Sequence, residues 1–257
     1  MNVISELSDL FMSTTPVLQV RNVSVYFGGV TAADDINLAV NQGELLGIIG
    51  SNGSGKSTFM NLCTGYIKAA AGQIDFNGQK ITGLSPRKIT RLGVARAFQH
   101  PQLFLDKTVR ESVVLGIASR DRFWNLRSIW RSAYATQADE IIRTFGLEEY
   151  ADTTNSQLPE GVKKLVDIAI AMALQPRLLL LDEPTSSVSS ANKFDVMDTL
   201  MSVLRQTGVT AIIVEHDMEI VERYMDRIVA WDNGRIIAEG AFADIMSNPQ
   251  VAQRVIG

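Results

Sequence analysis

The sequence predicts an α/β fold: a mostly parallel sheet with an added antiparallel β part and a helical part. Short apolar runs typical of buried strands, such as Leu178–Leu181, alternate with segments of helical spacing, which favours a parallel core. The pairs that begin at Asn77 and Asn233 are both Asn-Gly, and each separates two strand-like runs, which predicts hairpins. Residues 107–150 have helical character and no strand pattern, which predicts the helical part.

The N-terminal part of the chain is expected to be rich in β-structure. Residues 1–16 are predicted to form a loose leader, and residues 17–40 contain two alternating strand-like runs around a glycine break. An apolar run at 44–50 ends in glycine and is followed by helical spacing at 57–67. The apolar side of that predicted helix comprises Phe59, Met60, Cys63 and Ile67. A strand, a glycine-rich loop and a helix are therefore expected in succession.

The later elements continue the alternation of strand and helix. Ser85 followed by Pro86 predicts the start of a short helix. A further helix is expected at 192–205 and a buried strand at 209–214. Strand and helix patterns thus continue to alternate through residue 214.

One domain is predicted over residues 17–257. Residues 17–100 and 176–257 are expected to form the core with its antiparallel β part, and residues 101–175 a helical subdomain. No internal repeat or low-complexity linker interrupts this arrangement.

Composition excludes several classes of protein. With 46% hydrophobic and 20% charged residues among 257, the chain can bury a large core, so a disordered regulator is excluded. The net charge is −4 and the 24 Lys and Arg residues are scattered, so we expect no nucleic acid as main partner. Cys63 is the only cysteine, which excludes an internal disulfide. No apolar run approaches the ~20 residues of a spanning helix, so a membrane role requires a partner.

The strongest motif is GSNGSGKS at Gly50–Ser57, which fits G-x-x-x-x-G-K-[ST] between a predicted strand and helix. Its glycines let several backbone N–H groups converge on one phosphate, Lys56 supplies a point charge, and the Ser57 hydroxyl is placed to bind Mg²⁺. A glycine-rich turn that matches by chance is the alternative, and the strand-loop-helix context opposes it. The residues expected to bind the nucleotide here are Ser51, Asn52, Gly53, Ser54, Gly55, Lys56, Ser57 and Thr58.

An acidic pair follows the buried strand at 178–181. In open parallel sheets, ligands lie beyond the carboxyl ends of strands, so Asp182 and Glu183 should lie beside the phosphate-binding loop. Asp182 could hold Mg²⁺ through water, and Glu183 could take a proton from an attacking water molecule. An exposed acidic pair that merely closes a strand is the alternative.

Two further polar residues follow predicted strands. His216 comes after the strand at 209–214 and could contact the γ-phosphate and orient the water, although a lone histidine is more often structural. Gln99 follows a strand-like run and could add an oxygen ligand to Mg²⁺. The neighbouring His100 is expected to be a surface loop residue without a role.

Taken in order, these residues resemble the ABC ATPase family over nearly the whole chain. The elements are Phe27 before a Gly-Gly pair, the phosphate-binding loop, Gln99, a helical insert, a signature segment at 158–162, the acidic strand end and His216. The resemblance implies the ABC ATPase fold and a head-to-tail dimer that sandwiches two ATP molecules. It also implies that Phe27 stacks on adenine, although by pattern alone Phe27 would pass as strand core, and that Gln99 senses Mg²⁺ and the membrane subunits.

More narrowly, the chain is similar to the ATPases of branched-chain amino acid importers. The segments that carry this similarity are YFGGVTAADDINLAV, RLGVARAFQHPQLF, FGLEEYAD, VEHDMEIVERYMDRIV and GRIIAEGAFADIMSNPQVAQRVIG. The similarity implies transmembrane permease subunits, an external solute-binding protein, and a peripheral position at the cytoplasmic face of the inner or plasma membrane. Urea and short-chain amide importers use very similar ATPases, so they remain alternatives.

Two departures from the family pattern concern a partner's site. Leu-Pro-Glu-Gly-Val at 158–162 replaces the signature Leu-Ser-Gly-Gly-Gln, so the serine hydroxyl is absent and Glu160 adds a negative charge. Gly161 and the helix after it are kept, so backbone N–H groups can still face a phosphate. Ser189 stands where the family usually has aspartate. An asymmetric heterodimer with a second ATPase chain is therefore favoured over a homodimer, and a regulatory subunit with one degenerate composite site is an alternative.

The segment RDRFWNLRSIWR at 120–131 is a candidate docking surface for the permease. Trp and Arg are enriched at interface hot spots, and this segment contains Trp124 and Trp130 together with Phe123 and four arginines. Helix core with solvated arginines is the alternative. ABC proteins that act on nucleic acid or ribosomes generally carry two cassettes or a long coiled-coil insert, and this chain has neither.

Overall fold

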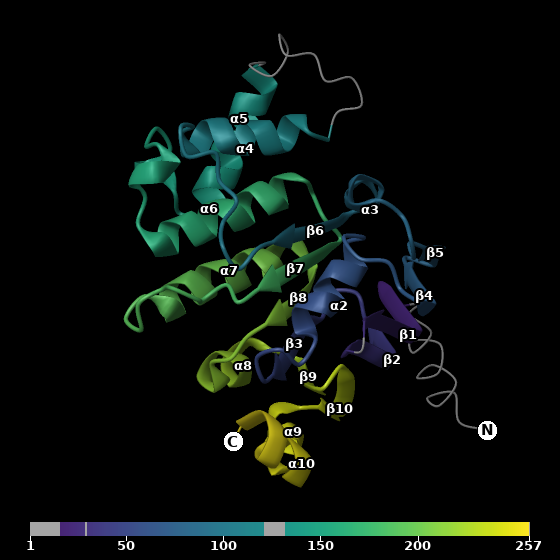
Figure 1. Cartoon of the computed structure of the whole chain (residues 1–257). Helices are drawn as coiled ribbons and strands as arrows, with labels where there is room; N and C mark the ends of the chain where they lie inside the picture. The colour runs from purple at the N-terminus through teal and green to yellow at the C-terminus, as the bar shows by residue number, and fades with distance from the viewer. Residues whose placement is uncertain (1–15, 29, 121–131, 257) are drawn as a thin grey trace, which may run out of the picture.

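The computed structural model describes residues 16–28, 30–120 and 132–256, and its strands form two sheets (Figure 1). The antiparallel sheet has the order β2-β1-β4-β5 and comprises β1 (Leu18–Phe27), β2 (Val30–Val40), β4 (Ala71–Phe76) and β5 (Gln79–Lys80). The second sheet has the order β10-β9-β3-β8-β7-β6 and comprises β3 (Leu45–Gly50), β6 (Val94–Ala97), β7 (Leu178–Asp182), β8 (Thr210–Val214), β9 (Arg227–Asp232) and β10 (Arg235–Gly240). All pairs in this sheet are parallel except β9 with β10. The predicted α/β fold class is confirmed.

The helices connect these strands and cover the parallel sheet (Figure 1). They are α2 (Lys56–Cys63), α3 (Pro86–Leu92), α4 (Val109–Ala118), α5 (Ser132–Thr144), α6 (Glu160–Ala173), α7 (Lys193–Thr207), α8 (Met218–Tyr224), α9 (Phe242–Ser247) and α10 (Pro249–Val251). Ser85 precedes α3 as predicted, but its side chain makes no capping hydrogen bond. Thr108 and Glu111 form a full capping box at the start of α4. None of the helices in the described ranges is long and apolar enough to cross a membrane.

Both predicted hairpins are present. Asn77 joins β4 to β5 and Asn233 joins β9 to β10, and both residues have positive φ, as does the glycine that follows each. Successive positive φ values are what a two-residue hairpin turn requires, and Asn-Gly adopts them most readily. The second hairpin brings β10 to the edge of the parallel sheet, beside the glycine-rich loop.

The core has two large layers, one on each face of the parallel sheet. Alternate residues of β7 point to opposite faces, so Leu179 and Leu181 pack with the helices α4 to α7, whereas Leu178 and Leu180 pack with α2 and the antiparallel sheet. Because both faces are covered, β7 is buried throughout, which explains its unbroken apolar run. The predicted helical subdomain at 101–175 thus shares its core with the sheet, and the domain boundaries stay predictions.

Near the N-terminus, one expectation is wrong and another concerns residues outside the described ranges. Helix α2 ends at Cys63, so the prediction that Ile67 belongs to its apolar side was wrong. The chain turns at Gly65, which has a φ of 76°, and Ile67 packs against the same core from outside the helix. The predicted leader lies outside the described residues except for Pro16.

Candidate functional site

The glycine-rich loop runs from the end of β3 to the start of α2. Gly55 has a φ of 110°, and a Cβ there would come within 2.3 Å of the Ala32 carbonyl oxygen, so only glycine fits. Lys56 follows at the first position of α2, and its Nζ donates to the carbonyl oxygens of Gly50 at 2.7 Å and Ser51 at 2.9 Å. The loop therefore already curls around the ammonium group of its own lysine.

Neighbouring elements hold this loop while leaving part of it accessible. The Gly234 N–H of the β9–β10 hairpin donates to the Ser54 carbonyl oxygen at 2.7 Å. Ser54 is buried, and its hydroxyl has no hydrogen-bond partner within the part of the chain that the structure describes. Ser51, Asn52, Gly53 and Ser57 are exposed, whereas Gly55 and Thr58 are intermediate. The exposed backbone can thus be approached from solvent.

Lys56 lies close to the acidic strand end. Burial lowers the pKa of Lys56, and the carboxylates of Glu183 and Asp182 oppose that shift by their negative charge. Lys56 and the acidic pair are therefore close enough to interact electrostatically, although more than a hundred residues separate them in sequence. The parallel sheet produces this juxtaposition because the carboxyl ends of β3 and β7 lie at the same edge.

Asp182 is buried and forms an ion pair that the sequence analysis missed. Arg96 on β6 donates to its carboxylate at 2.6 Å, and both side chains are only 7% exposed. Arg96 also donates to the Asn61 side chain on α2 at 2.6 Å. The only sequence signal for this ion pair was an arginine within a strand-like run. The pairing of that strand with β7 becomes visible only in the structure.

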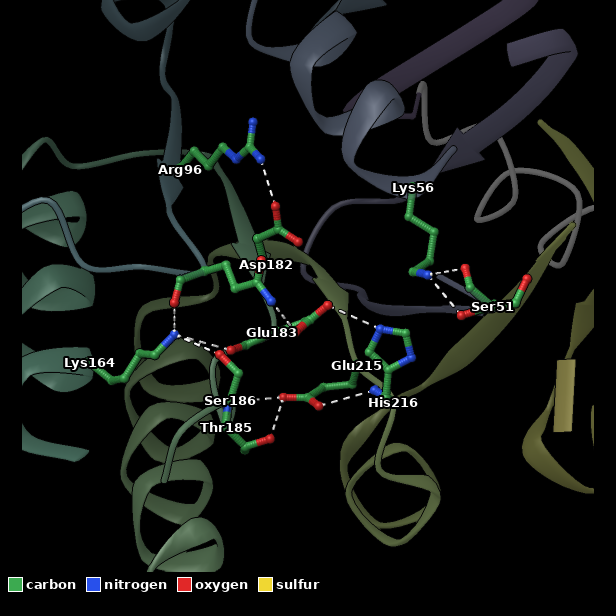
Figure 2. Close-up of polar contacts among 12 residues, drawn as sticks. Ser51, Lys56, Arg96, Lys164, Asp182, Glu183, Thr185, Ser186, Glu215 and His216 are labelled. Carbon is green, nitrogen blue, oxygen red and sulfur yellow. Dashed lines mark hydrogen bonds and ion pairs between the residues drawn. The ribbon is translucent and has the colours of Figure 1, made fainter. Parts of the chain in front are cut away.

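Glu183 is the point at which the predicted polar residues meet (Figure 2). Its Oε1 lies 3.0 Å from Nε2 of His216, and its Oε2 accepts from the Gln99 side-chain amide at 2.5 Å. Glu215 is buried behind this group and accepts from the backbone and hydroxyl of Thr185 and from the His216 N–H. Burial raises the pKa of Glu215, and the hydrogen bonds from Thr185 oppose the shift. The ends of β6, β7 and β8 therefore supply one connected cluster.

A second group that the sequence analysis missed is Lys164 on α6. It is buried, and it reaches toward Ser186 and the backbone of Glu183 (Figure 2). No sequence signal singled it out, because Lys163 precedes it and helical spacing alone does not separate the two. In the fold Lys163 is only partly exposed, whereas Lys164 is buried.

Other predicted residues lie apart from this cluster. Phe27 ends β1 with its side chain 49% exposed, so the alternative that it is strand core is wrong. Gly161 lies in the first turn of α6, where a Cβ would touch Val188 and Val196 rather than the glycine-rich loop. His100 is exposed in a loop, as expected. The proposed docking residues Phe123, Trp124 and Trp130 fall outside the described residues.

The oxygen groups around Lys56 suit a hard cation held together with a phosphate. A hydroxyl at Ser57, an amide oxygen at Gln99 and a carboxylate at Asp182 are the donors that Mg²⁺ prefers. The described residues contain no cluster of three or more His, Cys, Asp or Glu side chains that could hold a metal ion by themselves.

A glycine-rich loop with its lysine, facing a strand-end Asp-Glu pair across a parallel sheet, defines a nucleoside-triphosphate-binding ATPase core. Residues 33–186 match the family model described as ABC transporter. The chain belongs to the ABC transporter family, and it is an ATPase of that family, whose domain binds ATP and ADP.

Relatives and solved structures cover most of the chain. It is 34% identical to the probable branched-chain amino acid transport ATP-binding protein LivG of Archaeoglobus fulgidus, over 94% of this chain and 95% of that protein. It is 35% identical to the methionine import ATP-binding protein MetN of Rhizobium johnstonii, over 91% of this chain and 63% of that protein. A nucleotide-free ATP-binding cassette from an ABC transporter superposes with a TM-score of 0.83 at 32% identity, over 92% of this chain and 97% of that one.

Proposed function

We propose that this chain hydrolyses MgATP to power the import of amino acids, with branched-chain amino acids as the favoured class. The single observation that carries the hydrolytic role is the convergence of His216 and Gln99 on the Glu183 carboxylate, beside Lys56. The names of the relatives support the solute class: one serves branched-chain amino acids and another methionine. Urea and short-chain amides remain the alternative solutes.

The loop residues 51–58 would bind the triphosphate. Lys56 would exchange its bonds to the Gly50 and Ser51 carbonyls for bonds to phosphate oxygens, since phosphates offer full negative charge. The N-terminus of α2 opens at the same place and adds a favourable dipole. Phe27 would offer its exposed ring to adenine, because an aromatic face left in solvent gains from stacking.

Mg²⁺ would be held by Ser57, Gln99 and Asp182 together with the phosphates, and it would neutralise charge on the β- and γ-phosphates. Arg96 does not occupy both oxygens of Asp182, because only Oδ2 accepts its hydrogen bond. To bind the ion, Gln99 would give up its hydrogen bond to Glu183, because the Gln99 side-chain amide donates to that carboxylate in this structure. The residues present therefore fit the ion.

Glu183 would act as the general base. Its carboxylate would accept the proton of the attacking water, and His216 would hold the carboxylate and contact the γ-phosphate. Glu215 would keep His216 in place through the hydrogen bond to its backbone N–H. Each of these groups lies at the carboxyl end of a parallel strand, where the sheet is open to a ligand.

The partners would be transmembrane permease subunits, a second ATPase chain and, indirectly, a solute-binding protein, at the cytoplasmic face of the inner or plasma membrane. Phe104 and Leu105, in the segment after Gln99, are 60% and 59% exposed, which suits a docking surface for a permease segment. Asn155 is buried and donates to the Phe104 carbonyl oxygen at 2.9 Å, and this hydrogen bond stabilises the backbone of that surface. The Trp124 segment remains a further predicted contact.

A regulatory subunit that binds ATP without turnover is the second candidate, and the altered signature at 158–162 favours it. Steady-state ATPase and nucleotide-binding assays of the wild type and Glu183→Gln separate the two. We expect both to bind ATP and the variant to lose about 100- to 10,000-fold in kcat. The exposed Glu222→Gln on α8 is the matched control. Equal turnover in Glu183→Gln, or none in the wild-type transporter, rejects the hydrolytic role.

A further inference from the structure

Lys164 on α6 has an unusual position for a lysine, because it is only 3% exposed. Its ammonium group donates to the Gln99 carbonyl oxygen, to the Ser186 hydroxyl at 3.0 Å and to the Glu183 carbonyl oxygen at 3.3 Å. An ammonium group has three donors, and here each has an acceptor. Those acceptors belong to the segments that follow β6 and β7, so one cation joins two strand ends to α6.

One of those acceptors belongs to a residue with an uncommon backbone conformation. Glu183 has a φ of 50°, in the left-handed region that non-glycine residues rarely adopt. Its N–H donates to the Val214 carbonyl oxygen at 3.0 Å, and its own carbonyl oxygen accepts from the Ser186 N–H at 3.0 Å and from Lys164. Such a conformation persists only where the surroundings enforce it. The direction of the Glu183 carboxylate therefore depends on these contacts.

The same helix holds the Gln99 segment from a second side. Asp167, one turn after Lys164, accepts from the Phe98 N–H at 3.1 Å. Lys164 donates to the carbonyl oxygen of Gln99, which directly follows Phe98 in the chain. Because Gln99 donates from its side chain to Glu183, α6 fixes both members of that hydrogen bond through their backbones.

The charge of Lys164 is also matched to its surroundings. Burial lowers the pKa of Lys164, and the carboxylates of Asp167, Glu183, Glu215 and Asp182 oppose that shift, in this order of size. Removing the ammonium group would leave backbone carbonyl oxygens unpaired and a crowded set of carboxylates without this counter-charge. A neutral side chain of the same length therefore cannot replace it.

We propose that Lys164 is a positioning residue for ATP hydrolysis. Its ammonium group binds the backbone carbonyl oxygens of both Gln99 and Glu183 and thereby connects these two residues to α6. Helix α6 begins with the signature segment, and Gly161 lies one turn before Lys164. A shift of α6, when its N-terminus meets a nucleotide in the partner's site, would thus re-aim Glu183 in this chain's own site. This inference rests on the proposed function, because it takes Glu183 as the base.

The test compares Lys164→Met and Lys164→Arg, each in the assembled transporter, with the exposed Lys88→Met on α3 as the control for loss of a lysine. We expect Lys164→Met to lower kcat about 10- to 100-fold, with KM for MgATP within about threefold of the wild type, because misplacement of a reacting group acts on the chemical step. Lys164→Arg should recover part of kcat, since it keeps the charge. A kcat for Lys164→Met within about twofold of the wild type would overturn the proposal.

A second readout does not require turnover. Amide hydrogen exchange at Phe98, Glu183 and Ser186 should become about tenfold faster in Lys164→Met, whereas the amides of β3 should keep their wild-type rates. Unchanged exchange at all three amides would contradict the proposal. If Lys164→Met does not fold, Ser186→Ala decides, because it removes one acceptor and should lower kcat about two- to fivefold without changing KM.

The result for Glu183→Gln distinguishes a failure of the proposed Lys164 role from a failure of Glu183 as the base. If that variant loses turnover while Lys164→Met keeps it, only the role of Lys164 fails. If Glu183→Gln keeps wild-type turnover, the assignment of the base fails, and the exchange rates at Phe98 and Ser186 still report whether Lys164 holds both segments.

Discussion

The glycine-rich loop at 50–57 and the signature segment at 158–162 would both meet nucleotide, yet only the first keeps its family pattern. In the loop, Lys56 is buried among carbonyl oxygens and faces the acidic pair. In the signature segment, Pro159 offers no side-chain cap, and Glu160 pairs with Lys163 at 2.7 Å. The departure from the family pattern therefore lies in residues that a partner's site would use. We therefore keep the asymmetric dimer as a prediction, with the chain's own loop as the half expected to be competent.

The largest expected effect is loss of nucleotide binding in Lys56→Met. Lys56 is the one lysine in the sequence of the loop at 50–57, and truncating one partner of a buried charge pair costs roughly 2–5 kcal/mol. We expect ATP affinity to fall roughly 100-fold, measured by titration of a fluorescent ATP analogue. Glu160→Ala in the signature segment should leave this affinity unchanged in the monomeric chain. Equal losses in both variants would remove the contrast between the two regions.

A second change restores the signature segment. The double variant Pro159→Ser, Glu160→Gly returns a hydroxyl and removes a negative charge at the start of α6, so self-association around ATP should become productive. We expect ATPase activity per chain to rise about tenfold and to depend more steeply on protein concentration. The wild-type rate should stay low at every concentration. A wild-type rate that already grows with the square of concentration would show a competent homodimer.

The smallest expected effect concerns stability rather than activity. Burial raises the pKa of Asp167 to about 6 from an ordinary value of 3.8. The folded chain then binds this proton more tightly than the unfolded chain, so the free energy of unfolding falls as the pH rises from about 4 to about 6. Asp167→Asn has no such titration, so the difference between variant and wild type should change by about 2 kcal/mol over that window. Urea unfolding at a series of pH values measures it, and parallel profiles would contradict it.

How far the sequence predicted the molecule depends on how local each signal is. The glycine-rich loop, the Asp182-Glu183 pair and both Asn-Gly hairpins are short patterns whose chemistry lies within a few neighbouring residues, and the structure forms the hairpins as expected. Arg96 and Lys164 gave no such signal, because Arg96 lies 86 residues from Asp182 and Lys164 lies 65 residues from Gln99 in sequence. The order of strands in the sheet and the packing of α6 against it bring those partners together.

The limits of helical periodicity appear at Ile67. Its spacing fits the apolar side of α2, but periodicity does not show where a helix ends, and the backbone turns at Gly65. The same limit affects Lys163 and Lys164, which are adjacent in sequence, although Lys163 is partly exposed and Lys164 is buried.

The most direct measurement is a crystal structure of the Glu183→Gln chain grown with MgATP, in which hydrolysis is blocked and the substrate is retained. We predict the triphosphate in the loop at 50–57, with Lys56 moved from the Gly50 and Ser51 carbonyl oxygens to a phosphate oxygen. We also predict that the side chain at position 183 faces the γ-phosphate beside His216. A triphosphate bound elsewhere, or positions 182 and 183 turned away from it, would contradict the assignment of this site.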